Sequence, residues 1–180
     1  IFTGQSPSGG TIYFGTYVDD CAYWGTDDAS EAWFEAALGS KLKMDFMGDL
    51  SYYLGVHYEW SHTPDGRLTV HMSQEGQIHK MLLANDMDSP DSHYPVKTPF
   101  RSGLVIDSLS HDGILPTAKQ GLVTRYQSVV GGLNWLSLST RPDITSVTCL
   151  LASHLRNPSQ GHLESALHVL KYLKGSSDWG

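Results

Sequence analysis

The chain has 180 residues, 40% of them hydrophobic and 17% charged, a composition typical of a globular protein that buries roughly 70% of its unfolded surface. Its formal net charge of −7 argues against simple electrostatic binding of nucleic acid, because phosphate contacts are made by lysine and arginine. No stretch approaches the ~20 apolar residues of a membrane helix, and the first residues lack a secretion signal. Cys21 and Cys149 form no CxxC motif, which favours a reducing, intracellular setting over a disulfide scaffold.

Residues 1–10 are rich in glycine and serine and predict a loop. Residues 11–24 read TIYFGTYVDDCAYW, and their apolar runs predict two buried strands with Asp19 and Asp20 at or beside a tight turn. Asp-Asp suits such a turn less well than Asn-Gly, and it places two like charges side by side. A divalent cation between the carboxylates would relieve that repulsion, whereas the alternative interpretation is a solvated acidic turn.

Three further elements are predicted before the middle of the chain. Residues 27–39 predict a helix, because acidic residues and a serine stand at its start and a glycine at its end. Residues 52–60 and 67–72 predict the strands of a second hairpin around a Pro-Asp-Gly turn. Residues 73–85 predict a helix that Ser73 caps, with an apolar face of Ile78, Met81 and Leu82.

Residues 86–121 contain four prolines and no sustained period, and they predict an extended connector. Three helices are predicted after it. The first carries Leu122, Tyr126, Val129, Leu133 and Leu136 on one face, and its Gly131-Gly132 pair predicts close packing of another element. The second begins at Pro142, and the third runs from about residue 160 to residue 174, with Gly175 past its end.

Several classes of site have little support in the sequence. The nine histidines form no HExxH or His-x3-His arrangement, which argues against a catalytic zinc site. The chain has no Walker A motif and no GxGxxG motif, so a glycine-rich phosphate loop is not expected. Metal-assisted phosphoryl transfer is the chemistry that an adjacent carboxylate pair on a rigid hairpin serves best.

A series of short motifs runs along nearly the whole chain. Tyr17, Val18, Asp19 and Asp20 form the first, YVDD. The later segments are YLGV at 53–56, HMSQ at 71–74, TP at 98–99, YQSVVGGL at 126–133, TRPDI at 140–144 and KYLKG at 171–175. In their order these motifs resemble those of the copia-type retrotransposon reverse transcriptase, for which YVDD is a signature. The resemblance implies an α+β chain, in which residues 1–74 form a partial polymerase palm of two antiparallel hairpins and a helix. Residues 75–180 then form a thumb-like helical region that includes the connector 86–121.

The resemblance also implies roles for particular residues. Asp19 and Asp20 would be catalytic metal ligands for two Mg²⁺ ions, or for Mn²⁺ in their place, and Tyr17 and Val18 would lie near the primer end. Tyr53, Leu54 and Gly55 would hold the primer. The candidate phosphate contacts are Arg141, Lys171 and Lys174, for which a solvated surface is the alternative. The implied partners are an RNA template, a DNA primer and dNTPs, and the implied location is a cytoplasmic particle or the nucleus.

The sequence departs from the family pattern before the YVDD signature. The resemblance implies a third metal-binding aspartate on an earlier palm strand, together with fingers, and a ribonuclease H segment after residue 180. Only sixteen residues precede Tyr17, and none of them is acidic. We therefore expect part of an RNA-directed DNA polymerase that is inactive alone. The alternative is a decayed or domesticated retroelement remnant that acts as a non-catalytic interaction module.

Overall fold

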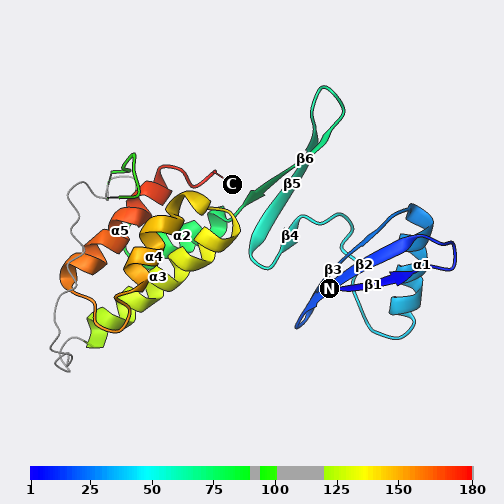
Figure 1. The fold of residues 1–180 in the computed structure, drawn as a ribbon, viewed down its shortest axis with the longest axis horizontal. Helices are drawn as coiled ribbons and strands as arrows, with labels where there is room; N and C mark the ends of the chain where they lie inside the picture. The colour runs from blue at the N-terminus through cyan, green and yellow to red at the C-terminus, as the bar shows by residue number, and fades with distance from the viewer. Residues whose placement is uncertain (90–93, 101–119, 180) are drawn as a thin grey trace. The chain divides into compact units, whose positions relative to one another are not determined.

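The computed structural model describes residues 1–89, 94–100 and 120–179, and the chain divides into two compact units, residues 1–59 and 60–180 (Figure 1). The sequence predicted a boundary at residues 74 and 75, whereas the units divide within the second hairpin. Among the described residues, no helix is long and apolar enough to cross a membrane.

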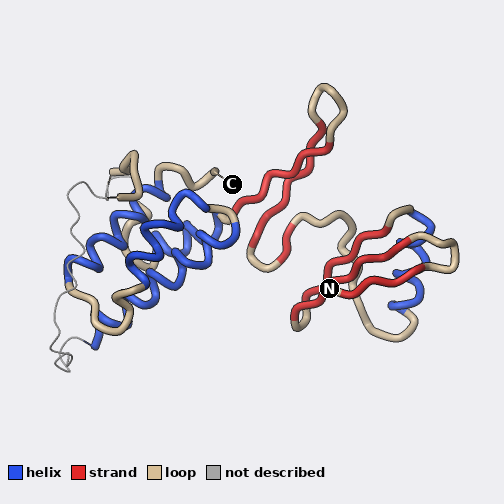
Figure 2. The backbone as a smooth tube through the Cα atoms, viewed as in Figure 1, coloured by secondary structure: helices blue, strands red, loops and turns tan. Residues whose placement is uncertain are grey.

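The first unit contains a three-stranded antiparallel sheet and one helix. The strands β1 (Phe2–Gln5), β2 (Thr11–Tyr17) and β3 (Asp20–Gly25) pair in the order β1-β2-β3, and α1 (Asp28–Gly39) packs on β2 and β3 (Figure 2). The prediction of a loop over residues 1–10 is therefore wrong for β1. All four β1 residues are exposed, and their strand conformation comes from pairing with β2 rather than from a local apolar pattern.

Only one face of this sheet is buried. On the face toward α1, Ile12 is 3% exposed, and Phe34 of α1 packs against Phe14 and Tyr23 with ring centroids 5.4 and 5.2 Å apart. On the other face, Tyr13 and Trp24 are cross-strand partners whose rings stack at 5.1 Å and stay largely exposed. The hairpin prediction is confirmed, but the prediction that both strands are buried is wrong for the open face.

A cluster of hydroxyl groups fixes the start of α1. Asp27 is the N-cap of the helix, and its Oδ1 accepts a hydrogen bond from the Ser30 amide at 2.8 Å. The Ser30 hydroxyl is buried and lies 2.8 Å from the hydroxyl of Ser6 in the β1–β2 connection. Hydrogen bonds from the side chain and backbone of Ser30 hold the pKa of Asp27 below its ordinary value. The predicted start of this helix is thus confirmed.

The second hairpin contains three strands where the sequence predicted two. The strands β4 (Tyr52–Tyr53), β5 (Val56–His62) and β6 (Leu68–Ser73) form an antiparallel sheet in that order, and β5 and β6 make the long two-stranded ribbon in Figure 2. Ser73 is the last residue of β6 rather than a helix cap. Gln74 occupies the N-cap position of α2 (Glu75–Leu83) without a capping side-chain bond.

The helical elements of the second unit enclose its core. They are α2, α3 (Gln120–Ser139), the 3₁₀ turn η2 (Pro142–Ile144), α4 (Thr145–Ala152) and α5 (Gln160–Lys174), and Figure 1 shows the α-helices packed side by side. The apolar faces predicted for these helices form the core, which includes Ile78, Leu82, Tyr126, Leu133, Leu151, Leu163 and Leu170. Leu150 of α4, which the spacing also predicts to face the core, is instead 45% exposed.

The prediction for the glycine pair in α3 is confirmed at one position. A Cβ at Gly132 would lie 2.6 Å from the Sδ and Cε atoms of Met81 on α2, whereas a Cβ at Gly131 would have nothing within 4 Å. Of the predicted connector 86–121, residues 90–93 and 101–119 lie outside the described residues, and residues 120 and 121 already belong to α3.

Candidate functional site

The two adjacent aspartates lie at the tip of the β2–β3 hairpin. Tyr17 pairs with Asp20, so Val18 and Asp19 form a two-residue turn and Asp20 begins β3. All four side chains are exposed. The prediction that the aspartates stand at or beside a tight turn is confirmed, and both carboxylates are open to a ligand approaching the tip.

The turn holds Val18 in an unusual backbone conformation. Its φ is +52°, in the left-handed region that β-branched residues rarely adopt, and its side chain is 84% exposed. A two-residue hairpin turn requires positive φ at one or both central residues, and glycine or asparagine would meet that need without strain. Val18 is therefore a strained residue beside the carboxylates, and strain of this kind is concentrated at functional sites.

Helix α1 holds the hairpin from its buried face. The Tyr23 hydroxyl donates a short hydrogen bond to the Glu35 carboxylate, and the Gly25 amide donates to Glu31 Oε1 at 2.8 Å. Burial, the hydrogen bond to Glu35 and the charges of Glu35 and Glu31 raise the pKa of Tyr23 to about 12. These bonds join β3 to the helix near the base of the hairpin, so the tip extends from a fixed base.

The carboxylates at the tip supply part of a metal cage. Asp19 and Asp20 offer the hard oxygen ligands that Mg²⁺ prefers. Within residues 1–89, 94–100 and 120–179, however, no group of three or more histidine, cysteine or acidic side chains is arranged to hold a metal ion. The described residues thus fit two ligands of such a site and contain no third.

The segment predicted to hold the primer is a sharp turn rather than a continuous strand. Tyr53 pairs with Val56, and the two residues between them, Leu54 and Gly55, have φ values of +50° and +80°. Positive φ at both central residues is the pattern of a type I′ turn, which explains the glycine at the second position. The three predicted residues therefore lie together at the turn between β4 and β5.

Arg141 is a buried structural residue, which corrects its prediction as a phosphate contact. It is 1% exposed, and its guanidinium donates to both carboxylate oxygens of Asp143 at 3.0 and 2.8 Å. It also donates to the carbonyl and hydroxyl of Ser176 at 2.7 and 2.8 Å and lies against the rings of Tyr172 and Trp179. Four of the five guanidinium N–H donors are used by these bonds, and the side chain is buried, so Arg141 is not placed to contact a phosphate at the surface.

The network around Arg141 shifts the titration of its partners. Burial alone would raise the pKa of Asp143, but hydrogen bonds from Arg141 and Tyr172 and the charge of Arg141 outweigh burial and hold that pKa below its ordinary value of 3.8. For Tyr172, burial and the hydrogen bond to Asp143 raise the pKa. The network joins η2 to α5 and to the residues after it.

The two predicted lysines lie near the end of α5 and are half-buried. Lys174 Nζ donates to the carbonyl of Ser89 at 2.7 Å, and the Lys171 carbonyl accepts a hydrogen bond from the Val96 amide at 3.4 Å. Both lysines lie in the last turn of α5, where the helix dipole stabilises positive charge. The structure thus gives Lys174 a role in holding the segment that precedes α3, and a phosphate contact at either lysine stays a prediction.

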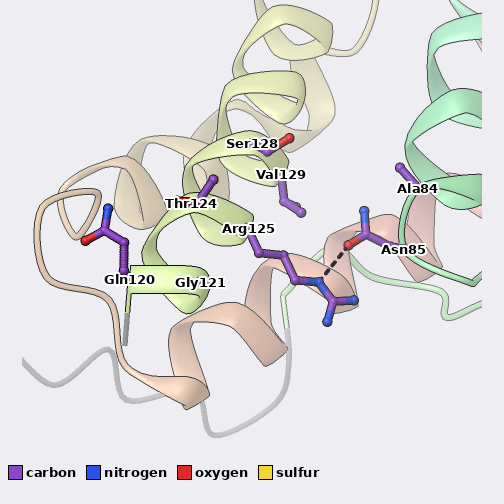
Figure 3. A pocket seen from close by; sticks show the side chains of 8 residues that line it. All are labelled: Ala84, Asn85, Gln120, Gly121, Thr124, Arg125, Ser128 and Val129. Atoms are coloured by element: carbon purple, nitrogen blue, oxygen red, sulfur yellow. Dashed lines mark hydrogen bonds between the residues drawn. The ribbon is translucent and has the colours of Figure 1, made fainter. Parts of the chain in front are cut away.

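Sequence reasoning missed two features of the helical unit. The first is a cavity of about 420 Å³ between the end of α2 and the first turns of α3, lined by residues that include Asn85, Thr124, Arg125 and Ser128. Arg125 Nε donates to Asn85 Oδ1 at 3.2 Å, so the two side chains are joined at this cavity (Figure 3).

The second missed feature is an exposed strip on α3. It contains Gly131, which has open space above it, and the exposed side chains of Trp135 (45%) and Leu138 (72%). The spacing of four and three residues places these positions on one side of the helix. The sequence shows that Gly131 and Trp135 are four residues apart and so lie on one side of a helix. It does not show whether that side faces the core or the solvent.

The chain is similar to proteins of retrotransposons. It is 30% identical over 94% of its length to the retrovirus-related Pol polyprotein from transposon RE2 of Arabidopsis thaliana, and 27% identical over 89% to that from transposon TNT 1-94 of Nicotiana tabacum. It spans only 11% and 12% of those polyproteins. It is also 29% identical over 94% of its length to a Saccharomyces cerevisiae protein named for transposon Ty5-1, of which it covers 51%.

The other comparisons give no match. No family model matches the sequence, and no solved structure matches it significantly. The assignment therefore rests on the Pol relatives, whose similarity extends along almost all of the chain. The chain is thus related to a segment of the Pol polyproteins of copia-type retrotransposons, as its motifs predicted.

Proposed function

We propose that this chain forms a palm and thumb part of an RNA-directed DNA polymerase, in which Asp19 and Asp20 are metal ligands for nucleotidyl transfer. The observation that carries the proposal is the hairpin tip, where two exposed carboxylates stand beside a strained Val18 on a base fixed by α1. The similarity to Pol polyproteins supports a retroelement origin, and the polymerase role itself is our proposal.

The residues of the first unit would have separate roles, metal binding and primer binding. When bound, two divalent cations would activate the 3′-hydroxyl of a primer and stabilise the leaving pyrophosphate. Asp19 and Asp20 would hold them through oxygen ligands, with a third ligand from outside the described residues. Tyr17, 62% exposed on the same rung as Asp20, would border the primer end. Tyr53, Leu54 and Gly55 would present a backbone turn to the primer strand.

The distribution of charge confines the objection to a nucleic-acid substrate to one of the two units. Residues 1–59 contain nine acidic and two basic residues, whereas residues 60–180 contain ten of each, which together account for the net charge of −7. The acidity therefore belongs to the unit that carries the proposed metal ligands, and the helical unit is neutral. An acidic unit attracts divalent cations, while a neutral one does not repel phosphate.

Helix α3 offers a surface for duplex in the helical unit. Gly131 lets another backbone approach the helix closely, and Trp135 provides an exposed flat ring one turn further on. We propose that this strip contacts the primer–template.

Trp135→Glu should then weaken duplex binding, measured by fluorescence anisotropy, at least tenfold. The same replacement at Leu83, 61% exposed on α2, should leave binding unchanged.

The decisive experiment places this chain in a longer Pol protein. The matching segment of the TNT 1-94 polyprotein is replaced by residues 1–180, and template-dependent, Mg²⁺-dependent primer extension is measured. We expect Asp19→Asn and Asp20→Asn each to lower extension at least a hundredfold. Asp49→Asn, an exposed acid of the same unit, should leave extension unchanged. An active chimera whose extension survives Asp19→Asn would disprove the proposed role of the tip.

Cation binding can be measured on the chain itself. Mn²⁺ should broaden the backbone NMR signals of residues 17–20 at lower concentration than those of residues 45–49, because of these two places the tip has adjacent carboxylates and the other does not. Asp19→Asn should remove the difference. Equal broadening at both places would favour the alternative, a non-catalytic interaction module.

A further inference from the structure

The cavity between the end of α2 and the first turns of α3 has no part in the proposed polymerase function (Figure 3). Its volume of about 420 Å³ falls within the range of sites for small molecules. Of the lining residues in the described part of the chain, Arg125 is the only charged one. No carboxylate of this lining therefore competes with a ligand for the guanidinium.

Two hydrogen bonds fix the Arg125 side chain at the cavity. Its Nε donates to Asn85 Oδ1 at 3.2 Å, and Asn85 Nδ2 donates to the carbonyl of Met81 at 3.0 Å. Asn85 is half-buried, and its backbone amide bonds the Leu82 carbonyl at the end of α2. The guanidinium is thus attached to a partner that is itself held in place, so a ligand has little side-chain entropy to remove.

The two terminal nitrogens of the same guanidinium are unused. Within residues 1–89, 94–100 and 120–179, the bond from Nε is the only hydrogen bond or ion pair of Arg125. By contrast, Arg141 makes four hydrogen bonds, and Arg67 pairs with Asp65 at 2.8 Å. Parallel N–H donors at the end of an arginine match the oxygens of a phosphate or a carboxylate.

Two hydroxyl groups of the cavity are unused as well. Near the end of α3, the hydroxyls of Ser137 and Ser139 donate to backbone carbonyls of their own helix at 2.9 and 3.1 Å. Such bonds are common for serine and threonine in helices. The hydroxyls of Thr124 and Ser128, which line the cavity, make no hydrogen bond within the described ranges. Both are therefore available to a ligand.

The surroundings of these donors favour an organic anion. The cavity lies at the first turns of a 20-residue helix, where the helix dipole places partial positive charge. Val129, which is 3% exposed, adds an apolar side chain to the lining. Residues 60–180 contain ten acidic and ten basic residues, so the net charge of the unit does not repel an anion.

We propose that this cavity binds a small organic molecule through a phosphate monoester group. The terminal nitrogens of Arg125 and the hydroxyls of Thr124 and Ser128 would donate to the phosphate oxygens, and the organic part would lie against Val129. A phosphate monoester offers three terminal oxygens, whereas a carboxylate offers two, so this number of donors favours the phosphate. The inference is independent of the proposed polymerase function.

NMR titration of the intact chain with phenyl phosphate tests the proposal. Saturable shifts should be centred on the amides of residues 84–85 and 120–129. Arg125→Gln should weaken binding at least tenfold, whereas Arg67→Gln, the matched change at an exposed arginine outside the cavity, should leave it unchanged. Phenol, which lacks the phosphate, should bind less than a tenth as tightly. Shifts centred elsewhere, or binding that survives Arg125→Gln, would overturn the proposal.

Further variants separate ligand recognition from stability and from simple charge attraction. Thr124→Ala combined with Ser128→Ala should weaken phenyl phosphate binding at least threefold without lowering the thermal unfolding temperature, because neither hydroxyl bonds another described residue. Arg125→Lys keeps the charge but loses the fork, and it should also weaken binding. Wild-type affinity in both would overturn the proposal. So would a loss of affinity in Trp135→Ala, which would place the probe on the strip proposed for duplex.

Discussion

Two residues in this chain show how conformation and burial decide a role that residue type leaves open. Val18 has a side chain suited to strands, yet it occupies a turn position with φ of +52°. Arg141 has a side chain suited to phosphate, yet it is 1% exposed and makes four hydrogen bonds inside the helical unit. The sequence contains both residues within recognisable motifs, but neither positive φ nor burial can be deduced from a motif.

Replacing Val18 by asparagine should stabilise the first unit by about 1 kcal/mol, because asparagine tolerates positive φ and the strain of a β-branched residue is lost. Urea denaturation followed by Trp fluorescence measures the change. Thr16→Asn, at an exposed strand position two residues earlier, is the control and should slightly destabilise the unit. If both replacements lower stability equally, Val18 is not strained in solution.

Removing the Arg141 side chain should destabilise the helical unit by about 1–3 kcal/mol, because the Ser176 carbonyl would lose its buried donor, while the Asp143 carboxylate is partly exposed to water. Arg141→Lys should recover only part of that loss, because an ammonium cannot form the two-pronged bond. Thermal unfolding followed by circular dichroism measures both variants. Lys171→Ala, outside the network, should change stability by less than about 0.5 kcal/mol. A similar loss in Lys171→Ala would argue against the network.

The same network predicts a pH dependence. The pKa of Asp143 is lower in the folded protein than its ordinary value of 3.8, so its contribution to stability is complete above that value. The contribution is lost as the pH falls through the lower, folded-state pKa. The free energy of unfolding of the wild type should therefore decline more steeply below pH 4 than that of Asp143→Asn. Parallel profiles would show that Asp143 does not titrate differently in the two states.

At the scale of elements, periodicity predicted the helices well and the first strand not at all. The apolar faces of α2, α3 and α5 are local patterns, so the sequence contains them completely. By contrast, β1 has no buried residue and exists because β2 pairs with it, which no local pattern can reveal. The sequence also failed to predict that the face with Tyr13 and Trp24 is open to solvent. Both faces of the hairpin carry aromatic residues, so the sequence predicted that both are buried.

The glycines of α3 provide a matched test of helix packing. Gly131→Ala should stabilise the helical unit by about 1 kcal/mol, because alanine has the higher helix propensity and its Cβ meets open space. Gly132→Ala places a Cβ 2.6 Å from Met81, so overpacking should exceed the propensity gain and destabilise the unit by about 1 kcal/mol. Guanidinium denaturation compares the two variants. Equal stabilisation would mean that Met81 moves aside freely.

The start of α1 depends on a glycine outside the helix. A Cβ at Gly10 would lie 2.0 Å from Asp27 Oδ2 and 2.2 Å from Ser30 Oγ, so Gly10→Ala must break the cap. We expect a loss of at least about 1 kcal/mol, the usual value of an N-cap, measured by urea denaturation of the first unit. Gly4→Ala, with nothing within 4 Å, is the control and should be nearly neutral.

At the scale of the whole molecule, charge separates the two units more clearly than the motifs do. The net charge of −7 arises entirely within residues 1–59, and residues 60–180 are balanced. Self-repulsion should therefore lower the stability of the first unit at low ionic strength and leave the second unaffected. Raising the salt concentration from 0.01 to 0.15 M shortens the electrostatic screening length from about 30 to about 8 Å, which weakens repulsion between all but neighbouring charges.

Hydrogen exchange resolves the two units in a single sample. Amides of β2 that bond β3 should exchange several-fold more slowly at 0.15 M than at 0.01 M salt, because screening stabilises the acidic unit. Core amides of α3, such as those of Tyr126 and Leu133, should change by less than twofold. Asp45→Asn combined with Asp49→Asn should reduce the salt effect in β2 without altering α3. An equal response of both units would mean that they unfold together and that the acidic charge acts on the whole chain.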